Sequence, residues 1–187
     1  MRIIAGKIKG KKILLPPDKF TRPLRDLVKE SIFNLITHSN KINFDIINSN
    51  VLDLFSGTGS FGLECLSRGA NKVTFFENYP PVINILEKNI ANTKFYNKSI
   101  LFKYDCFSFF KRNENNYSYD LIFVDPPFKE KKTNKLLEII RNKKIMKETG
   151  IIIIHRHKND DDIMDAQFNI IEQRKYGISK ITIGNLG

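Results

Sequence analysis

The segment V-L-D-L-F-S-G-T-G-S-F-G, residues 51–62, limits the possible folds of this chain more than any other part of it. An apolar strand ends in an acidic residue, a glycine-rich turn follows, and the turn leads into a helical stretch. Glycine allows positive φ values and close approach of the backbone to a ligand, and the start of a helix offers unpaired N–H groups. Strand, loop and helix in this order indicate a nucleotide-type site in an α/β fold.

The alternation of strand and helix continues along the chain. Apolar runs predict strands near residues 51–55, 72–76, 99–103, 119–124 and 148–154, with helical stretches between them. This order favours right-handed crossovers and a doubly wound, mainly parallel sheet. Runs at 168–175 and 179–184 predict a terminal antiparallel hairpin, which brings the sheet to seven strands. We expect residues 1–187 to form a single domain, since there is neither a repeat nor a long linker.

The first 17 residues are predicted to form a basic β-hairpin appended to this domain. The opening R-I-I-A-G-K-I-K-G-K-K-I-L-L has short β-prone runs, interrupted by Gly6 and Gly10 and ended by Pro16-Pro17. Apolar residues at helical spacing then predict an amphipathic helix over residues 24–38.

Basic residues are concentrated in two parts of the chain. The formal net charge is +11, with 31 Lys and Arg against 20 Asp and Glu. Residues 1–30 hold nine basic and three acidic residues, and residues 129–147 hold eight and two. A polyanionic partner, above all nucleic acid, is the usual physical reason for such clusters. Background lysine enrichment is the alternative, but it would spread the charge evenly.

The cysteines and the N-terminus indicate a cytoplasmic protein. Cys65 and Cys106 lie far apart, in different predicted helices, so we expect neither a disulfide framework nor a metal site. Gly and Lys interrupt the apolar residues of the N-terminus, and we expect neither a signal peptide nor a membrane span. A monomer is the default expectation.

The glycine-rich loop favours S-adenosylmethionine as its ligand. Gly57, Gly59 and Gly62 match G-x-G-x-x-G, and Glu77 ends the next strand, where it can accept hydrogen bonds from ribose hydroxyls. This pattern alone would suit an NAD-dependent oxidoreductase equally well. Asp53 argues against NAD, because a carboxylate at this loop repels a pyrophosphate but can bind the ammonium group of a methionine moiety.

Asp105 follows the third predicted strand and is then placed to bind the adenine amino group. Cys106 and Phe107 would lie beside the ring. Asp105 can instead cap the helix that follows it, and this alternative stays open.

The motif Asp125-Pro126-Pro127-Phe128 follows a buried apolar strand, at a position that carries chemistry in this architecture. The prolines remove two N–H donors and leave an acceptor-rich turn. An exocyclic amine of a base is a weak nucleophile, because its lone pair is delocalised into the ring. Acceptors that hold its hydrogens can turn the lone pair toward a methyl group, while Phe128 stacks on the base. We therefore expect these four residues to be catalytic, with no metal and no nucleophilic cysteine.

Blocks of residues from one end of the chain to the other resemble a known family, the bacterial 16S ribosomal RNA guanine-N2 methyltransferases of the small-subunit methyltransferase D type. The blocks are R-I-I-A-G-x-x-K-G, R-P-L-R-D-x-V-K-E-S-I-F-N-L, D-L-F-S-G-T-G-S-F-G-L-E-C-L-S-R-G-A, F-V-D-P-P-F and Y-G-x-S-K-I. The resemblance implies a class I S-adenosylmethionine-dependent methyltransferase (Rossmann-like) fold with an N-terminal β-hairpin extension. It also implies methyl transfer to N2 of a guanine in 16S ribosomal RNA, within the 30S subunit or its assembly intermediate.

The resemblance implies site residues by position. Glu77 would bind the ribose and Asp105 the adenine. Arg22 and Arg25 would face the active site or contact phosphate, although a solvated helix start is an equally good interpretation. The implied cofactor-binding residues are Asp53, Phe55, Ser56, Gly57, Thr58, Gly59, Glu77, Asp105 and Cys106, and the implied RNA-binding residues are Arg2, Lys7, Lys9, Lys11, Lys12, Arg22 and Arg25.

Several alternatives remain open at this point. An adenine-N6 or glutamine-N5 methyltransferase would use the same acceptor geometry, and a non-catalytic RNA-binding assembly protein could have the same fold. His155 and His157 follow the fifth predicted strand and could contact RNA, but an ordinary strand end is the better interpretation.

Overall fold

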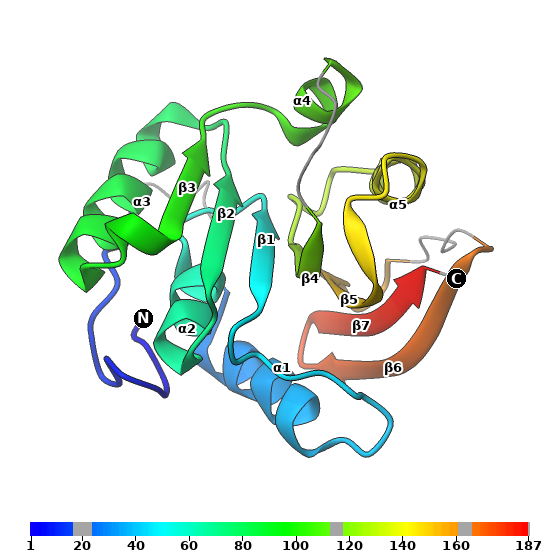
Figure 1. Cartoon of the computed structure of the whole chain (residues 1–187), viewed down its shortest axis with the longest axis horizontal. Helices are drawn as coiled ribbons and strands as arrows, with labels where there is room; N and C mark the ends of the chain where they lie inside the picture. The colour runs from blue at the N-terminus through cyan, green and yellow to red at the C-terminus, as the bar shows by residue number, and fades with distance from the viewer. Residues whose placement is uncertain (17–23, 113–117, 161–165, 187) are drawn as a thin grey trace.

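The computed structural model describes residues 1–16, 24–112, 118–160 and 166–186 and contains a single seven-stranded sheet. The strand order is β3-β2-β1-β4-β5-β7-β6 (Figure 1). The strands are β1 (Asn50–Leu54), β2 (Lys72–Phe76), β3 (Ser99–Phe102), β4 (Tyr119–Val124), β5 (Met146–His157), β6 (Phe168–Tyr176) and β7 (Ser179–Leu186). The ladders from β3 to β5 are parallel, and β7 runs antiparallel to both of its neighbours. The predicted mainly parallel sheet with a terminal hairpin is therefore confirmed.

Helices cover both faces of the sheet. The helices α1 (Asp26–His38), α2 (Ser60–Arg68) and α3 (Pro80–Thr93) pack on one face, and α4 (Cys106–Arg112) and α5 (Thr133–Asn142) on the other. Successive strand residues point to opposite faces, so Phe123 joins the first core and Val124 the second. In the described part of the chain, no helix combines the length and apolar composition needed to cross a membrane.

The end of β5 differs from the sequence prediction. The strand was expected over residues 148–154, but it continues to His157 and includes the H-R-H segment. His155 and Arg156 pair with Ile181 and Lys180 of β7. This pairing leaves the two side chains only 4% and 1% exposed. An exposed fraction of only 4% excludes the RNA contact considered for His155.

The N-terminal segment forms a short hairpin whose ladder is reduced to one bridge, between Arg2 and Lys12. The backbone N–H groups of Ile4 and Ala5 donate to the Glu64 carboxylate at 2.7 and 2.9 Å. Ile3 is fully buried in the core that lies under α1 and α2. The predicted hairpin is therefore docked on the domain, although Pro17, its expected end, lies outside the described residues.

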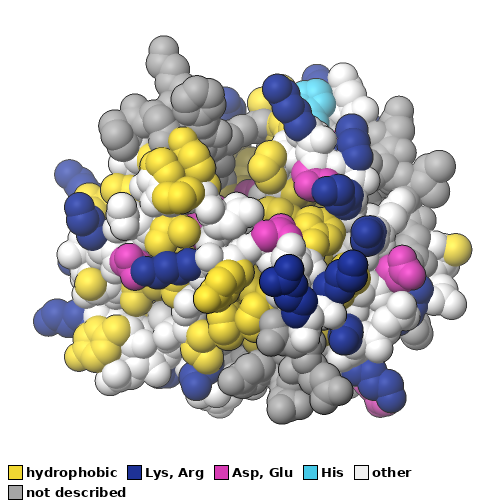
Figure 2. All heavy atoms as spheres, turned by 90° about the horizontal axis from the view of Figure 1, so that it is seen from above, with side chains coloured by type: hydrophobic (Ala, Val, Ile, Leu, Met, Phe, Trp, Pro, Cys, Tyr) yellow, Lys and Arg dark blue, Asp and Glu magenta, His cyan; other side chains and the backbone are white. Residues whose placement is uncertain are grey.

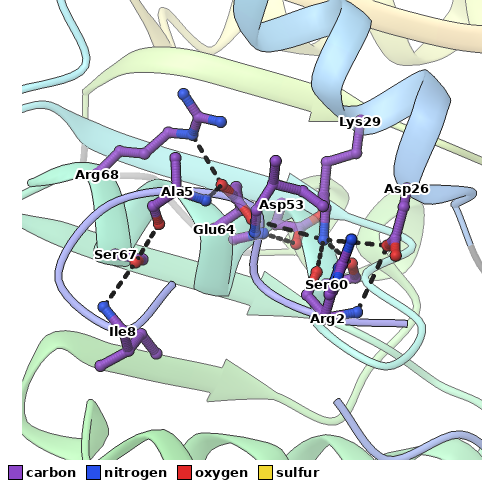
Figure 3. Close-up of polar contacts among 12 residues, drawn as sticks. Arg2, Ala5, Ile8, Asp26, Lys29, Asp53, Ser60, Glu64, Ser67 and Arg68 are labelled. Atoms are coloured by element: carbon purple, nitrogen blue, oxygen red, sulfur yellow. Dashed lines mark hydrogen bonds and ion pairs between the residues drawn. The ribbon is translucent and has the colours of Figure 1, made fainter. Parts of the chain in front are cut away.

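A buried ion pair holds this segment in place (Figure 3). Lys29 of α1 and Glu64 of α2 are both fully buried, with 3.6 Å between Lys29 Nζ and Glu64 Oε2. Lys29 Nζ also donates to the Arg2 carbonyl at 2.7 Å and to Ser60 Oγ at 2.9 Å. Burial lowers the pKa of Lys29, while the charge of Glu64 opposes this shift. Buried charges are tolerated where hydrogen bonds satisfy them, as they do here.

Gly6 and Gly10 test the docking of this segment as a matched pair. A Cβ at Gly6 (φ +83°) would lie 2.0 Å from the Ser67 carbonyl oxygen, whereas one at Gly10 (φ +86°) meets no described atom within 4 Å. Gly10→Ala should cost about 1 to 2 kcal/mol, the cost of a left-handed alanine. Gly6→Ala should cost at least ~1 kcal/mol more, because the backbone must move. Urea unfolding measures both, and equal losses would contradict the close approach.

Candidate active site

The carboxyl ends of β1 and β4 form the topological switch point of the sheet, where ligands bind in open α/β folds. Asp53 lies on β1 opposite Phe123 of β4, and Asp125 directly follows β4. Burial raises the pKa of Asp53 well above its usual range, and the nearby charges of Asp125 and Glu77 raise it further, while the Gly62 N–H opposes the shift. The structure therefore brings three predicted acidic residues together at this edge of the sheet, where the ligand crevice of an open α/β fold lies.

The glycine-rich loop keeps three residues in left-handed conformations, namely Phe55 (φ 59°), Gly57 (55°) and Gly59 (78°). A non-glycine residue in this region costs energy and is often retained at functional sites. Gly62 serves a different purpose, because a Cβ there would lie 2.4 Å from the Phe75 ring. The glycines thus permit both the tight loop and the close packing of α2 on β2.

Two loop residues of the predicted cofactor set are engaged in holding the loop. Ser56 Oγ donates to the Asp53 carbonyl at 2.6 Å and accepts from the Phe76 N–H at 3.0 Å. The Thr58 carbonyl accepts from Asn89 Nδ2 at 2.9 Å. Both side chains are buried, so they stabilise the conformation of the loop from its inner side.

A narrow pocket beside the loop is lined by residues at the ends of β1, β2 and β3, and several of them belong to the predicted cofactor set. Its lining consists of Phe55, Phe76, Glu77, Asn78, Tyr104, Asp105 and Cys106. Glu77 is fixed there by three backbone N–H groups: Gly57 donates to Oε2 at 2.8 Å, and Asn78 and Tyr79 donate to Oε1 at 2.9 Å. The pocket is therefore lined by two of the implied cofactor carboxylates, one of them with its position set by the backbone.

Asp105 caps α4, as the alternative prediction had it. Its Oδ2 accepts from the Ser108 N–H at 2.8 Å, three residues into the helix. Within the described residues, Oδ1 has no hydrogen-bond partner, which leaves it available to a ligand. Capping and adenine binding are therefore compatible roles for the two oxygens.

The thiols do not take part in the chemistry that this crevice can support. Burial raises the pKa of Cys106 to about 12 and that of Cys65 well above its usual value. Neither is a thiolate nucleophile at neutral pH. Both cysteines are free, and across residues 1–16, 24–112, 118–160 and 166–186 no group of His, Cys, Asp or Glu could hold a metal ion.

Arg156 fixes the D-P-P-F turn, a role that the sequence analysis missed. Its guanidinium donates to the carbonyls of Pro127 at 3.2 Å, Phe128 at 3.4 Å and Glu130 at 2.7 Å, and it pairs with Asp160 at 2.5 Å. Because the guanidinium is rigid and planar, one side chain holds three carbonyls at once. An arginine two positions after the apolar run I-I-I-I was the available signal.

The Asp125 carboxylate ends a chain of three hydrogen-bonded side chains. His155 Nδ1 lies 2.8 Å from Asp125 Oδ1, and His155 Nε2 lies 2.8 Å from Ser179 Oγ. The Phe128 ring stands edge-on to the rings of His155 and His157, with centroids 6.1 and 5.2 Å apart. The predicted catalytic residues therefore lie in one turn. Side chains of β5 contact this turn directly, and Ser179 of β7 holds His155.

The predicted RNA-binding side chains are exposed where the structure describes them. Arg2, Lys7, Lys9, Lys11, Lys12 and Arg25 are all exposed, and Arg22 lies outside the described residues. A second exposed set follows the D-P-P-F turn: Lys129, Lys131, Lys132, Lys135, Lys143, Lys144 and Lys147. Figure 2 looks down on the edge toward which β2 and β3 point, and Lys and Arg gather there most densely on the side of α5.

The buried Asp53 carboxylate gives a prediction about pH. Its pKa is raised in the folded protein, so the folded state binds this proton more tightly than the unfolded chain, and stability falls as the pH rises above the ordinary pKa of 3.8. Asp53→Asn cannot ionise and should avoid that loss. We expect its Tm at pH 8 to exceed that of the wild type by about 2 to 4 °C, the shift that ~1 kcal/mol gives at this size.

Thermal unfolding at several pH values checks this expectation. The difference between Asp53→Asn and wild type should shrink toward pH 4, whereas the exposed Asp45→Asn should show no such trend. A loss of stability in Asp53→Asn that is the same at pH 8 and pH 5 would contradict it.

Known proteins match this chain over nearly its full length. The family model described as conserved hypothetical protein 95 matches residues 1–185. Ribosomal RNA small subunit methyltransferase D of Haemophilus influenzae is 31% identical over 179 residues, which cover 95% of this chain and 90% of the relative. The protein of the same name from Buchnera aphidicola (strain APS, Acyrthosiphon pisum) is 30% identical, covering 92% of this chain and 86% of its own.

Solved structures show the same fold. HI0767 from Haemophilus influenzae aligns with a TM-score of 0.79 at 29% identity and covers 100% of this chain and 98% of its own. The proposed methyltransferase SMU.776, solved in complex with SAH, aligns over 84% of this chain and 49% of its own, with a TM-score of 0.65 at 19% identity. The class I methyltransferase fold and the family resemblance are thereby confirmed. The chain belongs to the conserved hypothetical protein 95 family, alongside the ribosomal RNA small subunit methyltransferase D proteins.

Proposed function

We propose that this protein transfers a methyl group from S-adenosylmethionine to the exocyclic N2 of a guanine in 16S ribosomal RNA. The observation that carries the proposal is the half-buried Asp125 carboxylate, which stands in an acceptor-rich turn beside the glycine loop. The names of the relatives support ribosomal RNA of the small subunit as the substrate class. We propose the 30S subunit or its assembly intermediate as the partner, and a monomer in the cytoplasm.

The charges at the crevice fit S-adenosylmethionine better than a dinucleotide. Glu77 and Asp125 both act electrostatically on Asp53, so acidic groups are concentrated here, and a pyrophosphate would be repelled and a cationic ligand attracted. Glu77 would hold the ribose, Asp105 the adenine amino group, and Asp53 with the loop the methionine part. When bound, S-adenosylmethionine supplies a methyl group on a positively charged sulfur, which an amine nitrogen takes up with loss of one proton.

The D-P-P-F turn would prepare the amine for this reaction. Arg156 occupies the carbonyls of Pro127 and Phe128, whereas the Pro126 carbonyl accepts no hydrogen bond from the described residues. Asp125 and Pro126 can therefore accept the two amine hydrogens, and Asp125 can take up the proton that is lost. Phe128 would stack on the base and position it.

The basic surfaces would bind the RNA backbone. One lies on the N-terminal hairpin. The other lies on α5 and the residues around it, on the side where Lys and Arg gather in Figure 2. These contacts position RNA without reading its sequence.

Labelled methyl transfer tests the proposed function directly. The substrates are 30S particles from cells lacking this protein, naked 16S RNA, DNA and total protein, and nucleoside mass analysis identifies the product. We expect N2-methylguanosine in 16S RNA. Label in N6-methyladenosine or methylglutamine would overturn the substrate, and salt-dependent RNA binding without any transfer would favour a non-catalytic assembly protein.

Asp125→Ala should separate catalysis from cofactor binding. We expect kcat to fall about 100-fold or more, the effect of losing one group that acts on the reacting atoms. The Kd for S-adenosylhomocysteine should stay within about twofold, because the proposed partner of Asp125 is the substrate amine. Asp120→Ala, at the other end of β4, loses its contacts to Lys147 and to the Asn50 N–H and serves as the control. Equal losses of kcat and cofactor affinity in Asp125→Ala would contradict the assignment.

Replacement of Lys7, Lys9 and Lys11 by Gln should weaken RNA binding and flatten its salt dependence. Each lost phosphate contact lowers the slope of log K against log salt by about 0.7 to 0.9. The exposed Lys88, Lys94 and Lys98, on and after α3, provide a control with the same change of charge. The same slope in both triple variants would show that the hairpin does not bind RNA.

A further inference from the structure

We propose that His155, held by Ser179, is a positioning residue for Asp125. The inference rests on the proposed function, which gives Asp125 the substrate amine as its partner. The three side chains come from the turn after β4, from β5 and from β7, and they lie 30 and 24 residues apart in the sequence. The sheet, not a local motif, brings them together.

The hydrogen bonds at the two ring nitrogens define where the proton lies. A carboxylate only accepts, so His155 Nδ1–H donates to Asp125 Oδ1 at 2.8 Å. In the neutral ring Nε2 is then an acceptor, and the Ser179 hydroxyl donates to it at 2.8 Å. Ser179 thereby selects the tautomer that offers its N–H to Asp125.

The exposure of the three groups shows which of them can meet a substrate. A serine hydrolase has the same three residue types, but there the hydroxyl meets the substrate and the carboxylate is buried. Here Ser179 is 2% exposed, whereas the Asp125 side chain is 19% exposed. Ser179 cannot reach a substrate as a nucleophile, so the group that this chain presents to the crevice is the carboxylate.

Asp125 lies beside another acidic side chain and depends on His155 for a donor. The Asp125 charge acts on the buried Asp53 carboxyl and raises its pKa, so the two groups lie close together. The neighbouring cations are engaged elsewhere, because Arg156 is bound to the turn carbonyls and Asp160, and Lys180 Nζ donates to the Asp160 carbonyl. In the described structure, His155 is the hydrogen-bond donor to the Asp125 side chain. It occupies Oδ1 and leaves Oδ2 to the amine.

Two substitutions of His155 separate hydrogen bonding from packing. Asn offers an amide N–H near the position of Nδ1, whereas Leu fills the space without a donor. We expect His155→Leu to lower kcat for methyl transfer about 10-fold or more, since small misplacements of a reacting group have such effects. KM for 30S particles and Kd for S-adenosylhomocysteine should change less than about twofold, and His155→Asn should recover most of the rate.

A second readout is independent of turnover. Nitrogen-15 NMR of the histidine rings should show His155 as the Nδ1–H tautomer in the wild type, and Ser179→Ala should shift it toward a mixture. Equal loss of kcat in His155→Leu and His155→Asn, or an Nε2–H tautomer in the wild type, would overturn the proposal. A wild-type rate in His155→Leu would overturn it while Asp125→Ala still confirms the proposed function. Absence of methyl transfer by the wild type would overturn both.

Discussion

Crossovers to opposite faces of one parallel sheet leave the ends of β1 and β4 side by side with no connection over them. Every candidate group for chemistry depends on this constraint. The glycine loop leaves β1 at this edge and the D-P-P-F turn leaves β4 beside it, so residues about seventy positions apart in the sequence share one crevice. The cost of this arrangement appears at Asp53, whose pKa is raised first by its burial and then by the charges of Asp125 and Glu77.

Buried polar side chains then fix the irregular segments around the crevice. Arg156 holds the carbonyls of the turn, Glu64 and Lys29 hold the N-terminal hairpin, and Asn89 holds the loop at Thr58. Groups of this kind add little net stability, because removal from water costs about as much as their contacts return. They specify instead which of many similar loop conformations is adopted, and a catalytic turn requires that precision.

The sequence predicted those features that depend on short segments of the chain. Strand positions follow from apolar runs, and the loop and turn follow from glycine and proline at fixed spacing. The extension of β5 to His157 was missed, because it requires a partner strand that starts 22 residues later. His155 looked like an ordinary strand end for the same reason, and its link to Ser179 exists only once β7 has paired. Asp105 was predicted with two alternative roles, and the structure shows the capping role while leaving one oxygen for the other.

The docking of the N-terminal hairpin on α2 has a consequence for the order of folding during synthesis on the ribosome. Ile4, Ala5 and Ile8 bind groups on α2 that follow them by 59 or 60 residues. At roughly 5 to 20 residues per second, those partners are synthesised some 3 to 12 s after the hairpin itself. Throughout that interval the basic segment has no place to dock. The hairpin therefore takes its final position only after α2 has been made, and its docking follows the folding of the first βα unit.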